Sequence, residues 1–239
     1  MAECAIITTS WDDGHPLDFK IAELLDKYKL PGTFYIPKNN AENRVMDEGS
    51  IQALAKRFEI GGHTLNHLTA EEIDLKTWKV EVEACYNWLS NITGEYPTSF
   101  CFPKGKYNKG AADVVFKTGF KLARTTELMN LTTGTDRIIP TTIQVYEHSK
   151  VTYFKHLLKR RRFNNLFLWM QGNCQTDIER LADKYLEESI AKNGCLHIWG
   201  HSWEIENKGL WKKMENVFKK ISGIPEIKYV SNKHLIQFS

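Results

Sequence analysis

The chain has 239 residues and a formal net charge of +3, and hydrophobic residues make up 42% of it. This composition is typical of a globular protein and excludes a disordered or collagen-like chain. No apolar run approaches the ~20 residues of a membrane span, so no transmembrane segment is expected, and the small net charge gives no reason to expect a nucleic-acid partner.

Strand-like and helix-like segments alternate along the chain. In chain order, we expect a strand at 5–8, a helix at 21–28, a strand at 33–36, a helix at 51–57 leading into 59–61, a helix at 78–89, a strand at 99–102, a helix at 111–117 and a strand at 121–124. Beyond these, we expect a strand at 138–146, a helix at 153–162, a strand at 166–170, a helix at 178–192, a strand at 195–199, a helix at 210–221 and a strand at 227–230.

About seven βα units follow from this alternation, which is typical of an α/β protein with a largely parallel sheet. No linker or low-complexity stretch divides them, so we expect one domain over residues 1–239, either a barrel or an open doubly wound sheet. In a βα barrel, reactive residues gather at the carboxyl ends of the strands.

The cysteine pattern and the first residues of the chain indicate the cellular compartment in which we expect the protein. The five cysteines are scattered and form no C-x-x-C pair, so we interpret them as reduced thiols rather than as a zinc ribbon or a disulfide framework. The first residues show no signal-peptide pattern. Both observations favour a cytoplasmic protein.

Two adjacent carboxylates follow the first expected strand, in the run Trp11-Asp12-Asp13-Gly14. Neighbouring side chains of an extended chain point in different directions, so one carboxylate could bind a metal while the other acts as a base. The same residues also fit a plain turn, because Asp and Gly favour turns.

Two histidines, His63 and His67, follow Gly61-Gly62. Their i, i+4 spacing predicts that both imidazoles lie on one face of a helical turn, and neutral imidazole is a favoured ligand of zinc and similar ions. The paired glycines would allow a tight backbone between strand and turn. Two further segments, 100–108 and 196–204, each carry a strand into a polar loop, and the second delivers His201.

Together, these four segments resemble the polysaccharide deacetylase family, also called the NodB-homology group or carbohydrate esterase family 4, over residues 6–204. The resemblance implies a distorted (β/α)7 barrel. It also implies metal-dependent hydrolysis of an N-acetyl group from a sugar or glycan, with release of acetate.

The resemblance assigns a role to each matching residue. It implies that Asp12 is the catalytic base, that Asp13, His63 and His67 bind a divalent metal ion, and that His201 is the general acid. A site of two histidines and one carboxylate suits zinc, with iron and cobalt as alternatives.

The segment 100–108 departs from the family pattern. The family has an arginine that orients the base at the position where this chain has Cys101. A thiol cannot replace the charge or the donors of a guanidinium. Three cations are candidates to replace it: Lys104, Lys106 and Arg124. The backbone N–H of Lys104 would correspond to the oxyanion donor of the family.

Aromatic residues beside these motifs are candidates for contacts with a sugar ring. Tyr107 and Trp203 are the candidates for substrate contact, although large aromatic side chains are more often part of a core, and we expect the core for Trp11 and Trp199. We also consider Glu204 as a group that orients His201.

The segment 155–162 is basic and contains several apolar residues. It fits a solvated helix face, and it also fits contact with an anionic lipid head or a sugar-linked phosphate. The expected substrate is therefore an acetylated sugar or glycan, with nucleotide-linked and lipid-linked forms and peripheral membrane contact as open alternatives. Two rival functions also remain open, a glycan-binding barrel with impaired catalysis and a hydrolase of a non-sugar amide.

Overall fold

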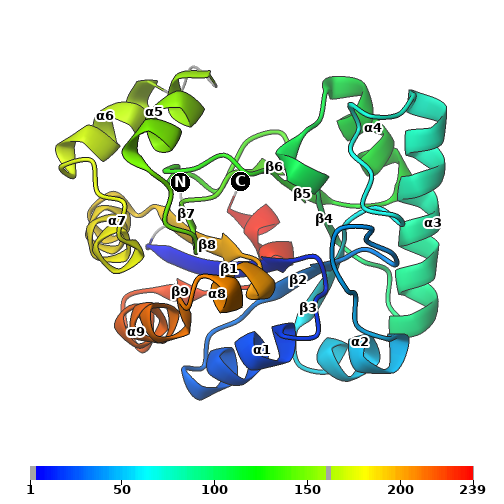
Figure 1. Cartoon of the computed structure of the whole chain (residues 1–239), viewed down its shortest axis with the longest axis horizontal. Coiled ribbons are helices and arrows are strands. Elements are labelled where there is room, and N and C mark those ends of the chain that lie inside the picture. Colours follow the sequence, from blue (N-terminus) through cyan, green and yellow to red (C-terminus); the bar gives the residue numbers. More distant parts are fainter. Residues whose placement is uncertain (1–3, 160–162, 239) are drawn as a thin grey trace.

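A curled, parallel β-sheet surrounded by helices forms the centre of the molecule (Figure 1). The computed structural model describes residues 4–159 and 163–238, without the side chain of Lys159. The strands are β1 (Ile6–Asp12), β2 (Thr33–Ile36), β3 (Glu59–Gly62), β4 (Ser99–Cys101), β5 (Leu122–Arg124), β6 (Ile138–Ile139), β7 (Ile143–Gln144), β8 (Cys195–Gly200) and β9 (Lys228–Tyr229).

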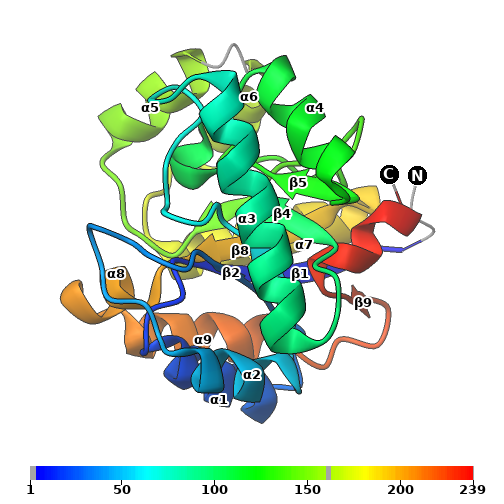
Figure 2. The ribbon, with the colours of Figure 1, turned by 90° about the vertical axis from the view of Figure 1, so that its right-hand side faces the viewer.

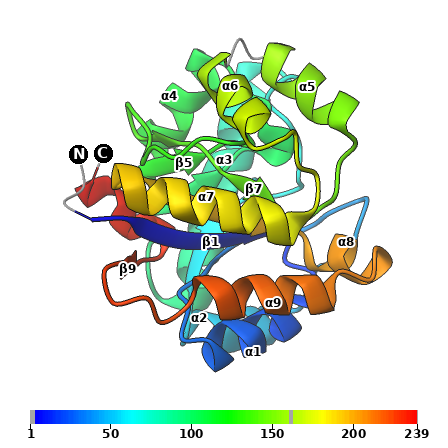
Figure 3. The ribbon, with the colours of Figure 1, turned by 90° about the vertical axis from the view of Figure 1, so that its left-hand side faces the viewer.

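Most helices follow strands, as the alternation predicts. They are α1 (Asp18–Lys27), α2 (Glu48–Ala55), α3 (Leu75–Thr93), α4 (Lys109–Thr118), α5 (Lys150–Lys159), α6 (Phe163–Gln171), α7 (Ile178–Lys192), α8 (Ser202–Asn207) and α9 (Trp211–Ile221), with short 3₁₀ turns at Pro103–Gly105 and Asn232–Gln237. Helix α3 lies across one side of the sheet (Figure 2), and α7 and α9 flank β1 on the opposite side (Figure 3). No helix within the described ranges is long and apolar enough to cross a membrane.

The strands pair in the order β6-β5-β4-β3-β2-β1-β8-β7, and β9 pairs with the start of β1. Every one of these pairings is parallel. The sheet is thus the curled sheet of a distorted βα barrel within a single α/β domain, as expected.

The segment 138–146, expected to be one strand, connects the two ends of the sheet order. Its first part, β6, pairs with β5, and its second part, β7, pairs with β8. Pro140 lies between them, and because proline has no N–H it cannot donate to a continuous ladder. One interrupted segment therefore pairs with β5 at one end of the strand order and with β8 near the other.

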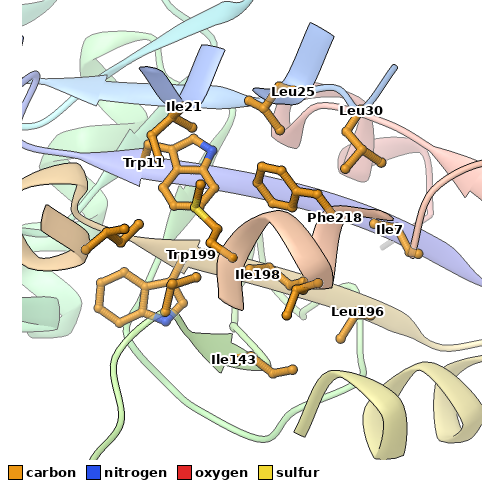
Figure 4. Close-up of a cluster of buried hydrophobic side chains, with 14 of the residues drawn as sticks. Ile7, Trp11, Ile21, Leu25, Leu30, Ile143, Leu196, Ile198, Trp199 and Phe218 are labelled. Atoms are coloured by element: carbon orange, nitrogen blue, oxygen red, sulfur yellow. The ribbon is translucent and has the colours of Figure 1, made fainter. Parts of the chain in front are cut away.

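The side chains of β1 alternate between two environments, as its period of two requires. Ile7 and Trp11 face the surrounding helices, where the Trp11 ring meets the Phe218 ring of α9 edge-on at 5.9 Å (Figure 4). Burial of each such side chain contributes about 1.5–3 kcal/mol. On the alternate face, Ser10 Oγ lies 2.9 Å from His197 Nε2 of β8. Within the barrel interior, β1 is therefore polar from Ser10 to Asp12.

A buried carboxylate organises the amino end of this interior. Glu59 accepts hydrogen bonds from the Ser99 hydroxyl (2.5 Å), the Thr33 hydroxyl (2.9 Å) and the backbone N–H of Lys233 (2.8 Å). These partners begin neighbouring strands or belong to the C-terminal 3₁₀ turn, so one side chain ties β2, β3 and β4 to the chain end. Buried polar groups of this kind are tolerated because their hydrogen bonds are made.

One expected strand is wrong. Residues 166–170 belong to helix α6, not to a strand. Periodicity cannot distinguish a short apolar run in a strand from one in a helix, and here Leu166 and Trp169, three residues apart, pack on the same core. The expected helix at 153–162 begins earlier, at Lys150, and its last three residues lie outside the described ranges.

Candidate active site and metal centre

The sequence motifs meet at the carboxyl ends of β1, β3, β4, β5 and β8, around a cavity of about 140 Å³. This position agrees with the general location of active sites in βα barrels. The residues that line it are Asp12, Asp13, Glu42, His63, His67, Lys104, Thr126, Trp199, His201 and Trp203.

The chain turns at Asp13 and Gly14, directly after the strand that ends at Asp12. Asp12 ends β1, whereas Asp13 has φ 78° and Gly14 has φ 61°. A side chain at Gly14 would also clash with Ile36, since an added Cβ would lie 2.6 Å from its Cγ2 atom. Glycine adopts such φ values at little cost, so Gly14 allows Asp12 and Asp13 to diverge at the end of the strand.

The expected helical turn at His63 and His67 is wrong. His63 follows β3 directly, and the chain then runs as an irregular loop in which Thr64 has φ 59° and His67 has φ 56°. These two left-handed residues curl the loop so that the imidazole centroids lie 5.0 Å apart. The pairing that the spacing predicted is therefore present, but a different backbone produces it.

Gly61 and Gly62 do not form the tight turn that we expected before His63. Their small size instead allows close packing. Both lie in β3, and neither has a positive φ. A Cβ on Gly61 would lie 2.5 Å from the Tyr35 ring, and one on Gly62 would lie 2.7 Å from the Phe120 ring. Glycine is therefore required because aromatic rings approach the backbone closely.

Three donor atoms converge beside the cavity. Asp13 Oδ1 lies 3.2 Å from His67 Nε2 and 3.7 Å from His63 Nε2, and the three ligand atoms lie within 4.8 Å of one another. Asp13 Oδ1 is buried and has no hydrogen-bond partner among the described residues. A carboxylate oxygen and two imidazole nitrogens in this arrangement fit a divalent ion such as zinc with open positions.

Further contacts orient these donors. His63 Nδ1 lies 2.8 Å from the carbonyl oxygen of Cys101, which directs Nε2 toward Asp13. Trp203 Nε1 donates to Asp13 Oδ2 at 2.9 Å, which leaves Oδ1 to the histidines. Such outer contacts fix the orientation of metal ligands.

The protonation states suit ligation. Burial lowers the pKa of His63 to about 4, so its imidazole is neutral near pH 7. Burial by itself would raise the pKa of Asp13, but the nearby imidazoles of His67, His201 and His63 hold it well below its ordinary value. A neutral imidazole and an ionised carboxylate are the forms that bind a metal.

Arg124 is the cation that meets Asp12. Its side chain is fully buried, and Nη2 donates to Asp12 Oδ2. The guanidinium lies 4.5 Å from the Trp199 ring centroid, an arrangement that stabilises a buried cation. The other two candidates pair elsewhere, Lys104 with Glu42 at 2.6 Å and Lys106 with Glu71 at 3.3 Å.

The sheet register explains this arrangement. Cys101 of β4 is the direct neighbour of Arg124 on β5. Burial raises the pKa of Cys101, which keeps it a thiol, and its Sγ lies 3.7 Å from Asp12 Oδ2. The thiol and the guanidinium therefore approach the same carboxylate oxygen from adjacent strands, with the charge on β5.

Asp12 keeps one oxygen free. Oδ1 is buried and has no hydrogen-bond partner among the described residues, while Oδ2 accepts from Arg124. Burial by itself would raise the pKa of Asp12, but Arg124, with smaller effects of His63 and His201, holds it below its ordinary value. The carboxylate is therefore ionised near pH 7 and can accept a proton at Oδ1.

His201 also lines the cavity and has a carboxylate partner. Its Nδ1 is 2.6 Å from Glu204 Oε2, and its Nε2 is 3.9 Å from Asp13 Oδ2. Burial by itself would lower the pKa of His201, but Glu204 and the two aspartates raise it to about 9. The imidazole is thus a cation near pH 7, and the placement of Glu204 agrees with the orienting role considered above.

The two aromatic candidates differ in position. Trp203 lines the cavity. Tyr107 instead stacks on Phe102 with ring centroids 4.3 Å apart, within an apolar cluster, and is not one of the residues that line the cavity. Trp11 is core, as expected, whereas Trp199 is buried and also forms part of the cavity wall.

Two polar residues near the site were not anticipated. Gln144 of β7 donates to Glu204 Oε2 at 3.2 Å, and its own oxygen lies 2.9 Å from His148 Nε2. Asp18 is fully buried behind the site and accepts a hydrogen bond from the Ser202 hydroxyl at 2.5 Å. Neither lies in a motif, so only the fold brings them here.

A second hollow of about 180 Å³ adjoins the cavity, and the two share Lys104, Thr126 and Trp199 as walls. Thr152 and Tyr153 of α5 line its far side. Helix α5, which carries part of the basic segment, therefore contributes to the surroundings of the site.

The family model described as polysaccharide deacetylase matches residues 2–123, which include four of the five motif residues, Asp12, Asp13, His63 and His67. No curated protein matches the chain significantly.

Solved structures share the fold over nearly the full chain. A Mycobacterium smegmatis protein assigned to the polysaccharide deacetylases has a TM-score of 0.67 at 12% identity and covers 100% of this chain and 93% of its own. The chitin deacetylase of the fungal pathogen Colletotrichum lindemuthianum has a TM-score of 0.60 at 15% identity, with 98% and 90% covered. The Bacillus subtilis peptidoglycan deacetylase PdaC has a TM-score of 0.60 at 15% identity, with 98% and 91% covered.

Proposed function

The chain belongs to the polysaccharide deacetylase family, and on that premise we propose that it is a metal-dependent hydrolase that removes N-acetyl groups from an acetylated sugar or glycan. One observation carries the proposal: the donor atoms of Asp13, His63 and His67 converge beside a carboxylate with a free oxygen. The substrates named for the structural relatives, chitin and peptidoglycan, support an N-acetylated glycan as the substrate class.

The metal-binding residues would be Asp13, His63 and His67. A divalent ion held by them would activate a water molecule and polarise the acetamide carbonyl. We propose zinc, because two imidazoles and a carboxylate suit it, and iron and cobalt fit the same donors.

Asp12 is the proposed general base. Asp12 lines the cavity, and its Oδ1 atom, which has no hydrogen-bond partner among the described residues, accepts the proton of the attacking water. Arg124 holds the other oxygen and keeps the carboxylate ionised. The new C–O bond forms at the acetyl carbon as the base takes this proton.

His201 is the proposed general acid. Glu204 binds Nδ1 and holds the imidazole as a cation, so Nε2 carries the proton that the departing sugar amine takes as the C–N bond breaks. The products are acetate and the free amine. The backbone N–H of Lys104 is the proposed donor to the oxyanion, because donors placed where charge develops lower the barrier most.

Acetate release tests the proposal. We expect the protein to release acetate from oligosaccharides of N-acetylglucosamine, to lose this activity with a chelator and to regain it with Zn²⁺. Asp12→Asn should lower kcat by about 10²–10⁴-fold, while Asp113→Asn, at an exposed position of α4, should leave kcat unchanged.

Two outcomes would replace the proposal with its rivals. Binding of the oligosaccharide without acetate release by the zinc-loaded protein would support a glycan-binding barrel. Hydrolysis of small non-sugar amides in preference to acetylated sugars would support an amide hydrolase of other specificity.

A further inference from the structure

The positive charge of the chain is concentrated in one segment. Residues 148–176 contain six of the 32 Lys and Arg residues and none of the 29 Asp and Glu residues. This segment therefore carries six positive charges, and the rest of the chain carries three net negative ones. Lys150 and Lys155 are its described, exposed cations, and Arg160–Arg162 lie outside the described residues.

The same segment exposes large apolar side chains. On α5 they recur at i, i+3 and i+7, and on α6 at i, i+4 and i+7, so each helix presents an apolar stripe to solvent. The residues are Val151, Phe154 and Leu158 on α5 and Phe163, Phe167 and Met170 on α6. They are six of the eleven exposed large hydrophobic residues in the described chain, and Phe163 and Phe167 are 61% and 62% exposed. We call these six residues with Lys150 and Lys155 the α5–α6 face.

The two helices lie together at one end of the molecule in all three views (Figures 1, 2 and 3), and they pack against each other. The other side of α5 looks inward, where Tyr153 is buried and lines the hollow beside the catalytic cavity. The exposed stripes are thus not required for the core. Exposed apolar groups gathered in this way mark an interaction surface.

We propose that the α5–α6 face binds the surface of an anionic lipid bilayer. The Phe, Leu, Val and Met side chains insert at the level of the headgroups, and the lysines contact the lipid phosphates. Apolar stripes beside Lys and Arg are the combination by which interfacial helices bind membranes, and basic residues near an anionic leaflet add attraction.

Charge favours a bilayer over a second copy of the chain. Two such faces brought together would place the exposed Lys150 and Lys155 of one copy against those of the other, and residues 148–176 contain no carboxylate to pair with them. An anionic bilayer supplies both the acyl chains and the negative charge that this face lacks. The inference goes beyond the proposed deacetylase function and does not depend on it.

Vesicle binding by the full chain tests the inference. Vesicles of phosphatidylglycerol and phosphatidylcholine in equal parts should co-sediment with the protein, and vesicles of phosphatidylcholine alone should bind it much more weakly. Added salt should weaken binding to the anionic vesicles, because it screens the attraction.

Surface variants separate the two parts of the face. Phe154→Ser and Phe167→Ser should each weaken binding about ten-fold or more, from the lost apolar burial. Val80→Ser and Tyr96→Ser are the matched controls, because they remove exposed apolar residues elsewhere and should leave binding unchanged.

Lysine variants test the electrostatic part. Lys150→Gln and Lys155→Gln should each weaken binding to anionic vesicles about five-fold, whereas Lys76→Gln and Lys121→Gln, exposed on other parts of the surface, should not. All these positions are exposed, so the variants should keep the melting temperature of the parent chain.

Three results would overturn the inference: equal binding to neutral and anionic vesicles, binding that the face variants do not weaken, and no binding to either vesicle. A dimer in solution that Phe154→Ser and Phe167→Ser convert to a monomer would assign the face to a second copy instead. Each of these outcomes can occur with acetate release intact or absent, so failure here is distinguishable from failure of the proposed function.

Discussion

At the scale of single residues, the proposed base Asp12 is held by the guanidinium of Arg124 on β5, one strand away from Cys101, which occupies the position of the family's arginine. Arg124 and Cys101 are direct neighbours in the register of β5 and β4, and both approach Asp12 Oδ2. A thiol provides a weak donor and no charge. The paired charge that stabilises ionised Asp12 in a buried site must therefore come from Arg124.

This geometry predicts the effect of Arg124→Met. Without the guanidinium, the pKa of Asp12 rises, and activity that needs the ionised base is lost at a higher pH as the pH falls. We expect kcat at pH 7 to decrease about 10–100-fold and the acid limb of the pH profile to move upward. Arg137→Met, at an exposed position, is the control.

Because the two positions are neighbours, the double variant Cys101→Arg/Arg124→Cys returns a guanidinium to Asp12 from the other strand. We expect it to recover most of the activity lost by Arg124→Met and to restore the acid limb. A single variant with wild-type kcat and an unchanged acid limb would show that Arg124 does not position the base.

Glu204 should set the alkaline limb in the same way. It raises the pKa of His201, which reaches about 9, and the proposed general acid can work only while protonated. Glu204→Gln should lower that pKa, so activity should decline at a lower pH as the pH rises. Rate profiles of this variant and of Glu206→Gln, on the exposed side of the same helix α8, measure the shift, and coincident alkaline limbs would exclude the role of Glu204.

At the scale of elements, strand β3 places His63, and its glycines determine how closely it packs. An added Cβ at Gly61 would lie 2.5 Å from the Tyr35 ring and 2.8 Å from Ser99 Oγ. Gly61→Ala should therefore displace the strand, at a cost of about 1–3 kcal/mol in the free energy of unfolding, and should weaken Zn²⁺ binding.

Chemical denaturation and zinc titration check both effects. Gly110→Ala is the matched control, because its Cβ would meet nothing closer than 3.4 Å in helix α4, where alanine is the better helix former. If Gly61→Ala matched the parent in both measurements, close packing of β3 would not position the ligand.

The elements themselves were predictable to different degrees. The helix at 178–192 was predicted with its observed bounds, because Ile178, Leu181 and Tyr185 repeat at helical spacing and Gly194 follows its end. In the structure, Asn193 ends the helix in a left-handed conformation. The strand at 166–170 was wrong, since its short apolar run carries no clear period. The histidine spacing predicted proximity correctly but not the loop, because the left-handed φ values of Thr64 and His67 have no simple sequence pattern.

At the scale of the whole molecule, the alternation of elements left a barrel and an open sheet as alternatives, and the resemblance to the family implied the barrel. The motif residues converge because the parallel strands of a barrel deliver their carboxyl ends to one face. The sequence did not distinguish Arg124 from Lys104 and Lys106, since that choice depends on strand register. Nor did it predict the break at Pro140, by which one segment pairs with both β5 and β8.

The proposed metal site also bears on the stability of the whole chain. Its ligands come from the turn after β1 and from the loop after β3, so they are brought together only in the folded state. A ligand that binds the folded state alone stabilises it, by about 2.7 kcal/mol at a free concentration of 100 times Kd. Zn²⁺ should therefore raise Tm, and a chelator should reverse the rise.

The effect must disappear when the donor set is broken. His63→Ala should abolish the zinc-dependent rise in Tm, whereas His234→Ala, at an exposed position near the C-terminus, should retain it. Scanning calorimetry with Zn²⁺ and with chelator measures the difference in each variant. An equal rise in His63→Ala and in the parent would place the bound zinc elsewhere, and no rise in the parent would remove the metal from the proposed mechanism.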